Sequence, residues 1–190
     1  MNKNVPNILT ILRIVAVPFF IFCYYKEQYI AAFILFVLAS LTDMADGHIA
    51  RKYDLVSNFG KFMDPLADKI LTYAAFCLFV EEKIIPAYFL IIVLFREFAV
   101  AGIRMLAASK GTVIAADIFG KIKTVLQMVS IPMYLFYDAM PSFGIDEIKY
   151  KTFYKGIFAG AKYLMIASII MTVISGINYI TKNVGVLKDD

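Results

Sequence analysis

Long apolar segments alternate with short polar connections along the whole chain. An apolar stretch of about 17 to 25 residues is long enough to cross a bilayer as a helix, because the hydrocarbon core is about 30 Å thick. Six such segments occur, at residues 7–25, 29–45, 59–80, 85–106, 119–137 and 158–180. The pattern predicts an all-α integral membrane protein with six transmembrane helices, forming a single domain over residues 1–190.

Composition agrees with a membrane protein. Of 190 residues, 61% are hydrophobic, whereas an ordinary soluble domain contains about 45–50% apolar residues. The net charge of +4 comes from basic residues scattered over the connections. Anionic lipid headgroups and phosphorylated substrates account for that charge, so no nucleic-acid partner is expected. The first segment is expected to be a retained helix, because no small-residue cleavage pattern follows Tyr25.

The distribution of lysine and arginine predicts the orientation, because cytoplasmic loops carry the excess of positive charge. With both chain ends inside, the cytoplasmic side collects Lys3, Arg51, Lys52, Lys61, Arg104, Lys110, Lys121, Lys123, Lys182 and Lys188. The opposite side holds fewer lysines, and acidic residues partly offset them. The protein is therefore expected to be N-in and C-in, with a polar cavity that faces the cytoplasm.

From the end of the second segment to the start of the third, residues follow a fixed spacing, Asp43-x2-Asp46-Gly47-x2-Ala50-Arg51-x8-Gly60-x3-Asp64-x3-Asp68. Residues three or four apart share a helix face, so each pair of aspartates should project together. The glycines are expected to mark the helix ends, and a short connection at residues 51–59 would bring the two pairs face to face.

Four carboxylates at the ends of predicted membrane helices indicate a metal site. Each costs roughly 2.5–3.5 kcal/mol at the centre of a membrane helix, so a compensating partner is expected. Hard oxygen ligands suit Mg²⁺ or Mn²⁺, and two ions sharing carboxylates would serve phosphoryl transfer. Helix capping would explain one acidic residue at a helix end, but it does not explain four at this spacing. His48, the only histidine, is expected to face solvent and is left out of the site.

The string resembles the signature of the CDP-alcohol phosphatidyltransferase family, D-x2-D-G-x2-A-R-x8-G-x3-D-x3-D, and matches every fixed position. The resemblance implies a six-helix membrane enzyme, usually a homodimer, that transfers a phosphatidyl group from a CDP-linked lipid to an alcohol and releases CMP. It implies that Asp43, Asp46, Asp64 and Asp68 bind the metal ions, and that Asp68 is also the general base.

The same resemblance implies a set of positions for CDP-diacylglycerol, in which glycines let the cytosine approach the backbone and the arginine meets the diphosphate. These positions are Gly47, Ala50, Arg51 and Gly60. A guanidinium suits this role because it holds phosphate oxygens by paired hydrogen bonds. Asn7 and Thr10 are expected either to contact the nucleotide or to cap the first helix.

Longer blocks indicate the acceptor. Residues 5–10 with Arg13, 60–69, 96–99 and 120–124 resemble the family's bacterial phosphatidylglycerophosphate synthases over most of the chain. The implied acceptor is sn-glycerol 3-phosphate, and the implied location is the bacterial plasma membrane. A phosphorylated acceptor needs cations, and the predicted ones are Arg104, Lys121 and Lys123, each of which is otherwise a marker of the cytoplasmic side.

Three alternatives stay open at this stage. Arg96 and Glu97 lie near mid-membrane, so either they pair structurally or Arg96 faces the polar cavity. Within the family, the acceptor is open to replacement by serine, inositol phosphate or phosphatidylglycerol. From another class, membrane aspartates also line divalent-cation transporters, but one cluster at a single edge gives no path across and Arg51 would repel cations.

Overall fold

The computed structural model describes the backbone of residues 5–53, 58–115 and 117–187, and within it the side chains of residues 10–42, 63, 66–67, 69–115 and 117–186. Throughout these ranges the regular elements are helices, as the apolar pattern predicts. They are α1 (Val5–Tyr25), α2 (Tyr29–Tyr53), α3 (Asn58–Glu81), α4 (Ala87–Ser109), α5 (Ile118–Ala139), the short 3₁₀ helix η1 (Met140–Phe143), α6 (Lys151–Lys182) and α7 (Val184–Leu187).

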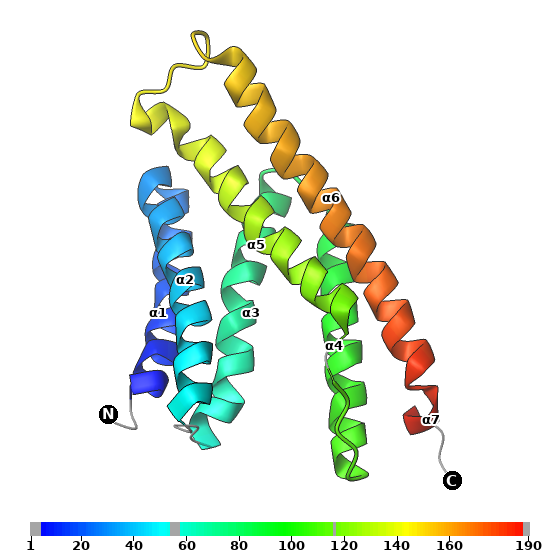
Figure 1. The fold of residues 1–190 in the computed structure, drawn as a ribbon. Helices are drawn as coiled ribbons and strands as arrows, with labels where there is room; N and C mark the ends of the chain where they lie inside the picture. The colour runs from blue at the N-terminus through cyan, green and yellow to red at the C-terminus, as the bar shows by residue number, and fades with distance from the viewer. Residues whose placement is uncertain (1–4, 54–57, 116, 188–190) are drawn as a thin grey trace.

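The helices form two groups that α5 connects (Figure 1). α1 packs against α2 and α3, while α5 contacts α2 on one side and lies along α6 on the other. α4 packs mainly against α6 and touches α3 only lightly. The N-terminal end of α1, the C-terminal end of α2, the N-terminal end of α3 and the C-terminal end of α6 lie at the same end of the molecule (Figure 1). The aspartate string is therefore at the end of the molecule where α1 begins and α6 ends.

Two details of the predicted helix ends are wrong. α2 continues through Gly47 to Tyr53, and α3 already begins at Asn58, before Gly60, so both glycines lie inside helices. Glycine within a helix costs only about 1 kcal/mol relative to alanine, which packing against neighbouring helices readily outweighs. α4 begins after Pro86, because proline favours the start of a helix and restricts the residue before it.

A buried aromatic and aliphatic core joins the first group of helices to α5 and α6. Its fully buried members include Phe20 of α1, Phe36 of α2, Phe79 of α3, Tyr134 of α5 and Met165 of α6. The ring centroids of Phe20 and Phe36 lie 5.8 Å apart, and those of Phe79 and Tyr134 lie 5.2 Å apart. This core fixes the position of α3 against α5.

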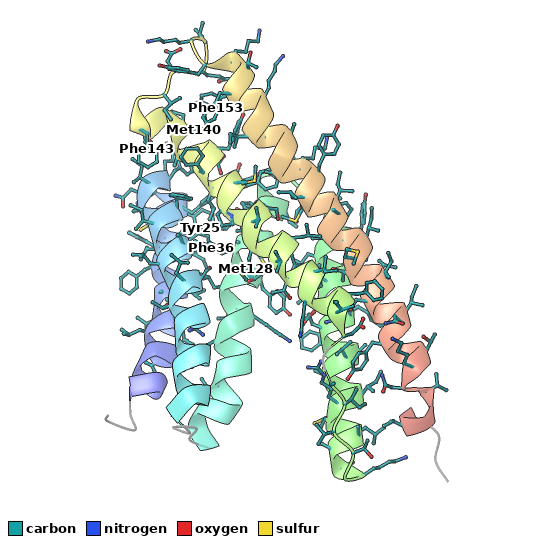
Figure 2. All side chains as sticks on the ribbon, viewed as in Figure 1. Tyr25, Phe36, Met128, Met140, Phe143 and Phe153 are labelled. Carbon is teal, nitrogen blue, oxygen red and sulfur yellow. The ribbon has the colours of Figure 1, made fainter. Side chains whose placement is uncertain are left out.

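At the other end of the molecule, η1 continues α5 and turns the chain towards α6 (Figure 2). Met140 of η1 is fully buried, and the ring of Phe143 lies 6.1 Å from that of Phe136 on α5. η1 thus closes the end of the bundle that is remote from the aspartate string.

Large apolar side chains also project outward from the bundle (Figure 2). On α4, Phe95 and Phe98 are each 70% exposed and Met105 is 74% exposed, which is unusual for a protein surrounded only by water. In the described part of the chain, α6 meets both the length and the hydropathy expected of a membrane span, with a mean hydropathy of 2.0 in its most apolar window. That α1 to α6 cross a membrane stays a prediction.

Two glycines allow α4, α5 and α6 to meet around one arginine. Arg96 of α4 donates from Nη1 to Glu97 and from Nη2 to the hydroxyl of Ser175 on α6, at 2.8 and 2.6 Å. A Cβ atom at Gly120 of α5 would lie 2.8 Å from Nη2 of this guanidinium, and one at Gly176 of α6 would lie 3.2 Å from Cγ. The absence of a side chain at both positions therefore gives Arg96 its place between the helices.

Replacing Gly120 with alanine should displace the Arg96 guanidinium from Ser175. Loss of a hydrogen bond to a charged group costs about 1.5–3 kcal/mol, and the better helix propensity of alanine returns about 1 kcal/mol, so we expect a net loss of about 1 kcal/mol. Thermal unfolding of the detergent-solubilised protein measures the change. Gly102→Ala is the matched control, because a Cβ atom there meets nothing within 4 Å; equal unfolding temperatures for the two variants would contradict the assignment.

Candidate functional site

The two halves of the aspartate string lie on two contacting helices. Asp43 and Asp46 lie in the C-terminal part of α2, and Asp64 and Asp68 lie in the first turns of α3. The side chains of these four aspartates fall outside the described residues, as do the side chains of Asn7, Ala50 and Arg51. The metal site and the nucleotide contacts therefore stay predictions, supported by the placement of both helix ends at one end of the molecule (Figure 1).

A buried carboxylate on α4 brings three helices together, and one of its partners, Lys69, directly follows the string. Glu97 of α4 is 7% exposed. Its Oε2 atom lies 2.7 Å from Nζ of Lys69 on α3, while Oε1 accepts from Nη1 of Arg96 at 2.8 Å and from Nζ of Lys123 on α5. Arg96 and Glu97 thus pair structurally, the first of the two alternatives that the sequence leaves open.

The four charged side chains do not balance. Among the side chains that the structure describes, three cations surround one carboxylate, although a single cation would neutralise it. Positive charge that is removed from water without a counterion is costly. The surplus is therefore suited to an anion that approaches from outside the cluster, and phosphate is the anion that both implied substrates carry.

A small polar cavity lies beside this cluster. Its volume is about 40 Å³. Its polar lining residues are Lys69, Thr72, Glu97, Lys123, Thr124 and Gln127, and Tyr73, Val93 and Met128 complete the lining. Thr72 lies four residues after Asp68, on the same face of α3 and about 6 Å, or slightly more than one turn, further along the helix. The cavity is therefore about one helical turn from the position of the predicted general base.

Gln127 contributes a donor to this cavity. It is 4% exposed, and its Nε2 atom has no hydrogen-bond partner among the residues that the structure describes. A buried amide N–H without a partner costs about 1–3 kcal/mol, so such groups usually face a bound water or ligand. The cavity is large enough for a water molecule or a hydroxyl group.

The cations predicted to bind the acceptor phosphate have different surroundings. Lys123 is 4% exposed and directed to Glu97. Arg104 is exposed on α4, donates from Nε to the hydroxyl of Tyr179 at 3.1 Å, and lies over that ring. Lys121 is exposed in the first turn of α5. Their role as phosphate ligands stays a prediction for all three residues.

One further contact holds the helices that carry these residues. Asn178 of α6 donates to Asp117 at 3.0 Å, which ties the start of α5 to α6. Thr10, predicted to contact the nucleotide or to cap α1, is 3% exposed and lies a full turn inside that helix. Its depth within α1 is unlike that of an N-cap residue.

Sequence reasoning missed Lys69 and Gln127 as members of the site. The signal for Lys69 was its place next to Asp68, and the signal for Gln127 was a polar side chain inside an apolar segment, four residues after Lys123. Neither signal identifies a contact, because the partners come from helices far apart in the chain. The cost of mid-membrane charge indicates that Arg96 and Glu97 of α4 need partners, but the contacts of Glu97 with Lys69 of α3 and Lys123 of α5 depend on how the helices pack.

Comparison with known proteins agrees with the signature. Residues 3–174 match the family described as CDP-alcohol phosphatidyltransferase. A protein of Bacillus subtilis (strain 168), named CDP-diacylglycerol--glycerol-3-phosphate 3-phosphatidyltransferase, is 36% identical to this chain over 97% of each protein. A protein of the same name from Rickettsia bellii (strain RML369-C) is 40% identical over 69% of this chain and 74% of its own length.

The similarity extends well beyond the aspartate string. The matched range begins before α1 and ends within α6, so it includes the helices that carry Lys69, Glu97 and Lys123. Both the family match and the level of identity over nearly the whole chain lead to the same assignment. This chain belongs to the CDP-alcohol phosphatidyltransferase family.

Proposed function

We propose that this protein transfers the phosphatidyl group of CDP-diacylglycerol to sn-glycerol 3-phosphate, giving phosphatidylglycerophosphate and CMP in phospholipid biosynthesis. The observation that carries the proposal is the complete signature on α2 and α3, within a chain that aligns over 97% of its length with a relative named for this reaction. The surplus of positive charge around Glu97 supports a phosphorylated acceptor over serine.

The donor set of the string fits a divalent metal. Four carboxylates on contacting helices offer only oxygen ligands, which suit Mg²⁺ or Mn²⁺. Asp43, Asp46, Asp64 and Asp68 would hold the metal, with two ions as the expected number. When bound, the metal would supply positive charge that stabilises the phosphate oxygens of the reacting lipid.

The chain's own residues account for the proton and for substrate orientation. In the proposed reaction, a hydroxyl oxygen of the acceptor forms a bond to the phosphatidyl phosphorus, and the bond from that phosphorus to CMP breaks. CMP leaves with the electron pair, and the carboxylate of Asp68 accepts the hydroxyl proton. Arg51 orients the diphosphate by paired hydrogen bonds, and the cations Arg104, Lys121 and Lys123 attract the acceptor phosphate.

The proposed setting is the bacterial plasma membrane. Six helices, α1 to α6, would cross it as one domain over residues 1–190, with both chain ends and the active site on the cytoplasmic side. The exposed apolar side chains of α4 and the apolar length of α6 support contact with lipid. The N-terminal end of α1 and the C-terminal end of α6 lie on one side of the bundle (Figure 1). This arrangement supports an even number of membrane crossings. A homodimer is proposed on the family resemblance alone.

Release of CMP tests the function directly. Detergent-purified protein with CDP-diacylglycerol and Mg²⁺ should release CMP with glycerol 3-phosphate, and should release little with serine, inositol phosphate or phosphatidylglycerol. Chromatography separates and quantifies CMP and the lipid product. Turnover with another acceptor would keep the family's chemistry but overturn the acceptor, whereas no turnover with any of them would overturn the transferase.

Asp68→Asn should abolish most of the turnover while the protein stays folded. Loss of a general base typically lowers the rate by about 10²–10⁴, and asparagine also offers a poorer ligand to the metal. The rate of CMP release and the thermal unfolding temperature are measured together. Asp146→Asn, in the exposed connection before α6, is the control and should stay within about twofold of the wild type, because most surface substitutions have small effects.

A further inference from the structure

Lys69 differs from the other two cations around Glu97 in its exposure. Its side chain is 37% exposed, whereas those of Arg96 and Lys123 are 11% and 5% exposed. A lysine ammonium has three N–H donors, and one of them is directed to Oε2 of Glu97 at 2.7 Å. The two buried cations share the other carboxylate oxygen. Lys69 is therefore the member of the cluster best placed to contact an incoming anion.

Two cavities meet at Lys69. The polar cavity of about 40 Å³ has Lys69 and Glu97 in its lining, and so does a larger groove of about 410 Å³ between α3 and α4. The rest of the groove is almost entirely apolar, with Leu66, Ile70, Tyr73, Leu94, Phe98 and Ala101 as its other lining residues. Lys69 and Glu97 thus lie at the boundary between the polar cavity and the apolar groove.

A ligand that occupies both cavities must combine an anionic group with an apolar chain. Phospholipid precursors have this form, and the exposed apolar residues Leu66 and Phe98 place the groove at the surface of the bundle. The polar cavity lies about one turn of α3 from Asp68, as its lining residue Thr72 shows. The anionic group would therefore lie close to the reacting atoms.

We propose that Lys69 binds a phosphate oxygen of a substrate, and that Glu97 is the positioning residue that holds its ammonium at the boundary of the two cavities. The proposal rests on the proposed function, since both substrates of that reaction carry phosphate. The apolar groove favours the diphosphate of CDP-diacylglycerol over the phosphate of glycerol 3-phosphate as the group bound.

Lys69→Gln and Lys69→Arg separate binding from folding. In Lys69→Gln the carboxylate of Glu97 keeps Arg96 and Lys123 as partners, so the protein should fold. Two measurements on detergent-purified protein are needed: the rise in unfolding temperature caused by each substrate alone, and the KM and kcat for CMP release. Lys155→Gln, an exposed lysine on α6, is the matched control.

The expected result is a loss of stabilisation by CDP-diacylglycerol in Lys69→Gln, with a KM for this lipid about tenfold higher, a smaller change in kcat, and substantial recovery in Lys69→Arg. The same losses for glycerol 3-phosphate would assign Lys69 to the acceptor phosphate. Wild-type stabilisation and KM for both substrates in Lys69→Gln would overturn the proposal.

The role of Glu97 has its own test. If Glu97 positions Lys69, then adding Lys69→Gln to Glu97→Asp should raise the KM much less than it does in the wild type, because the shorter carboxylate already misplaces the ammonium. Independent, multiplying effects would overturn the positioning role. If the wild-type protein binds both substrates but releases no CMP, the proposed transferase function is contradicted, and the binding measurements still decide the role of Lys69. If it binds neither substrate, both the function and the role of Lys69 are contradicted.

Discussion

The arrangement of α3, α4 and α5 depends on the ion pairs that the carboxylate of Glu97 makes. α4 and α5 bring the buried cations Arg96 and Lys123 into an apolar bundle, where charge without a partner is costly, and α3 brings the partly exposed Lys69. One carboxylate accepts from all three, through Lys69, Arg96 and Lys123. Because α3 and α4 otherwise make few contacts, this ion cluster supplies much of what fixes α3, the helix that carries Asp64 and Asp68, against α4.

The cluster also connects the fold to the chemistry. A transferase that joins two phosphorylated substrates must bring two negative groups together, and surplus positive charge lowers that repulsion. The signature aspartates lie on α2 and α3 at one end of the molecule, and Lys69, which follows Asp68 on α3, is joined through Glu97 to Arg96 of α4 and Lys123 of α5. Gly120 and Gly176 matter in this account because they admit Arg96 between the helices, which in turn orients its neighbour Glu97.

Much of the fold was predictable, because the six apolar segments of membrane length correspond to α1 to α6, with only residues 85 and 86 of the fourth segment outside its helix. The helix limits were less so: Gly47 and Gly60 are ordinary helix breakers in isolation, but here they lie within α2 and α3. For the site, spacing alone predicts the role of the aspartates, which stays a prediction, and the cost of mid-membrane charge indicates that Arg96 needs a partner. Sequence could not show that Lys69 and Lys123 share that partner, or that Gln127 faces a cavity, because such contacts depend on the packing of distant helices.

The stability of Glu97→Gln tests the central claim most directly. Removing one partner of a buried ion pair costs about 3–5 kcal/mol, because the remaining charges are left uncompensated. Thermal unfolding in detergent should therefore show a large fall in unfolding temperature for Glu97→Gln, and a partial return when Lys123→Met removes one of the buried cations as well. An unfolding temperature for Glu97→Gln equal to that of the wild type would contradict the claim that this carboxylate holds the three helices together.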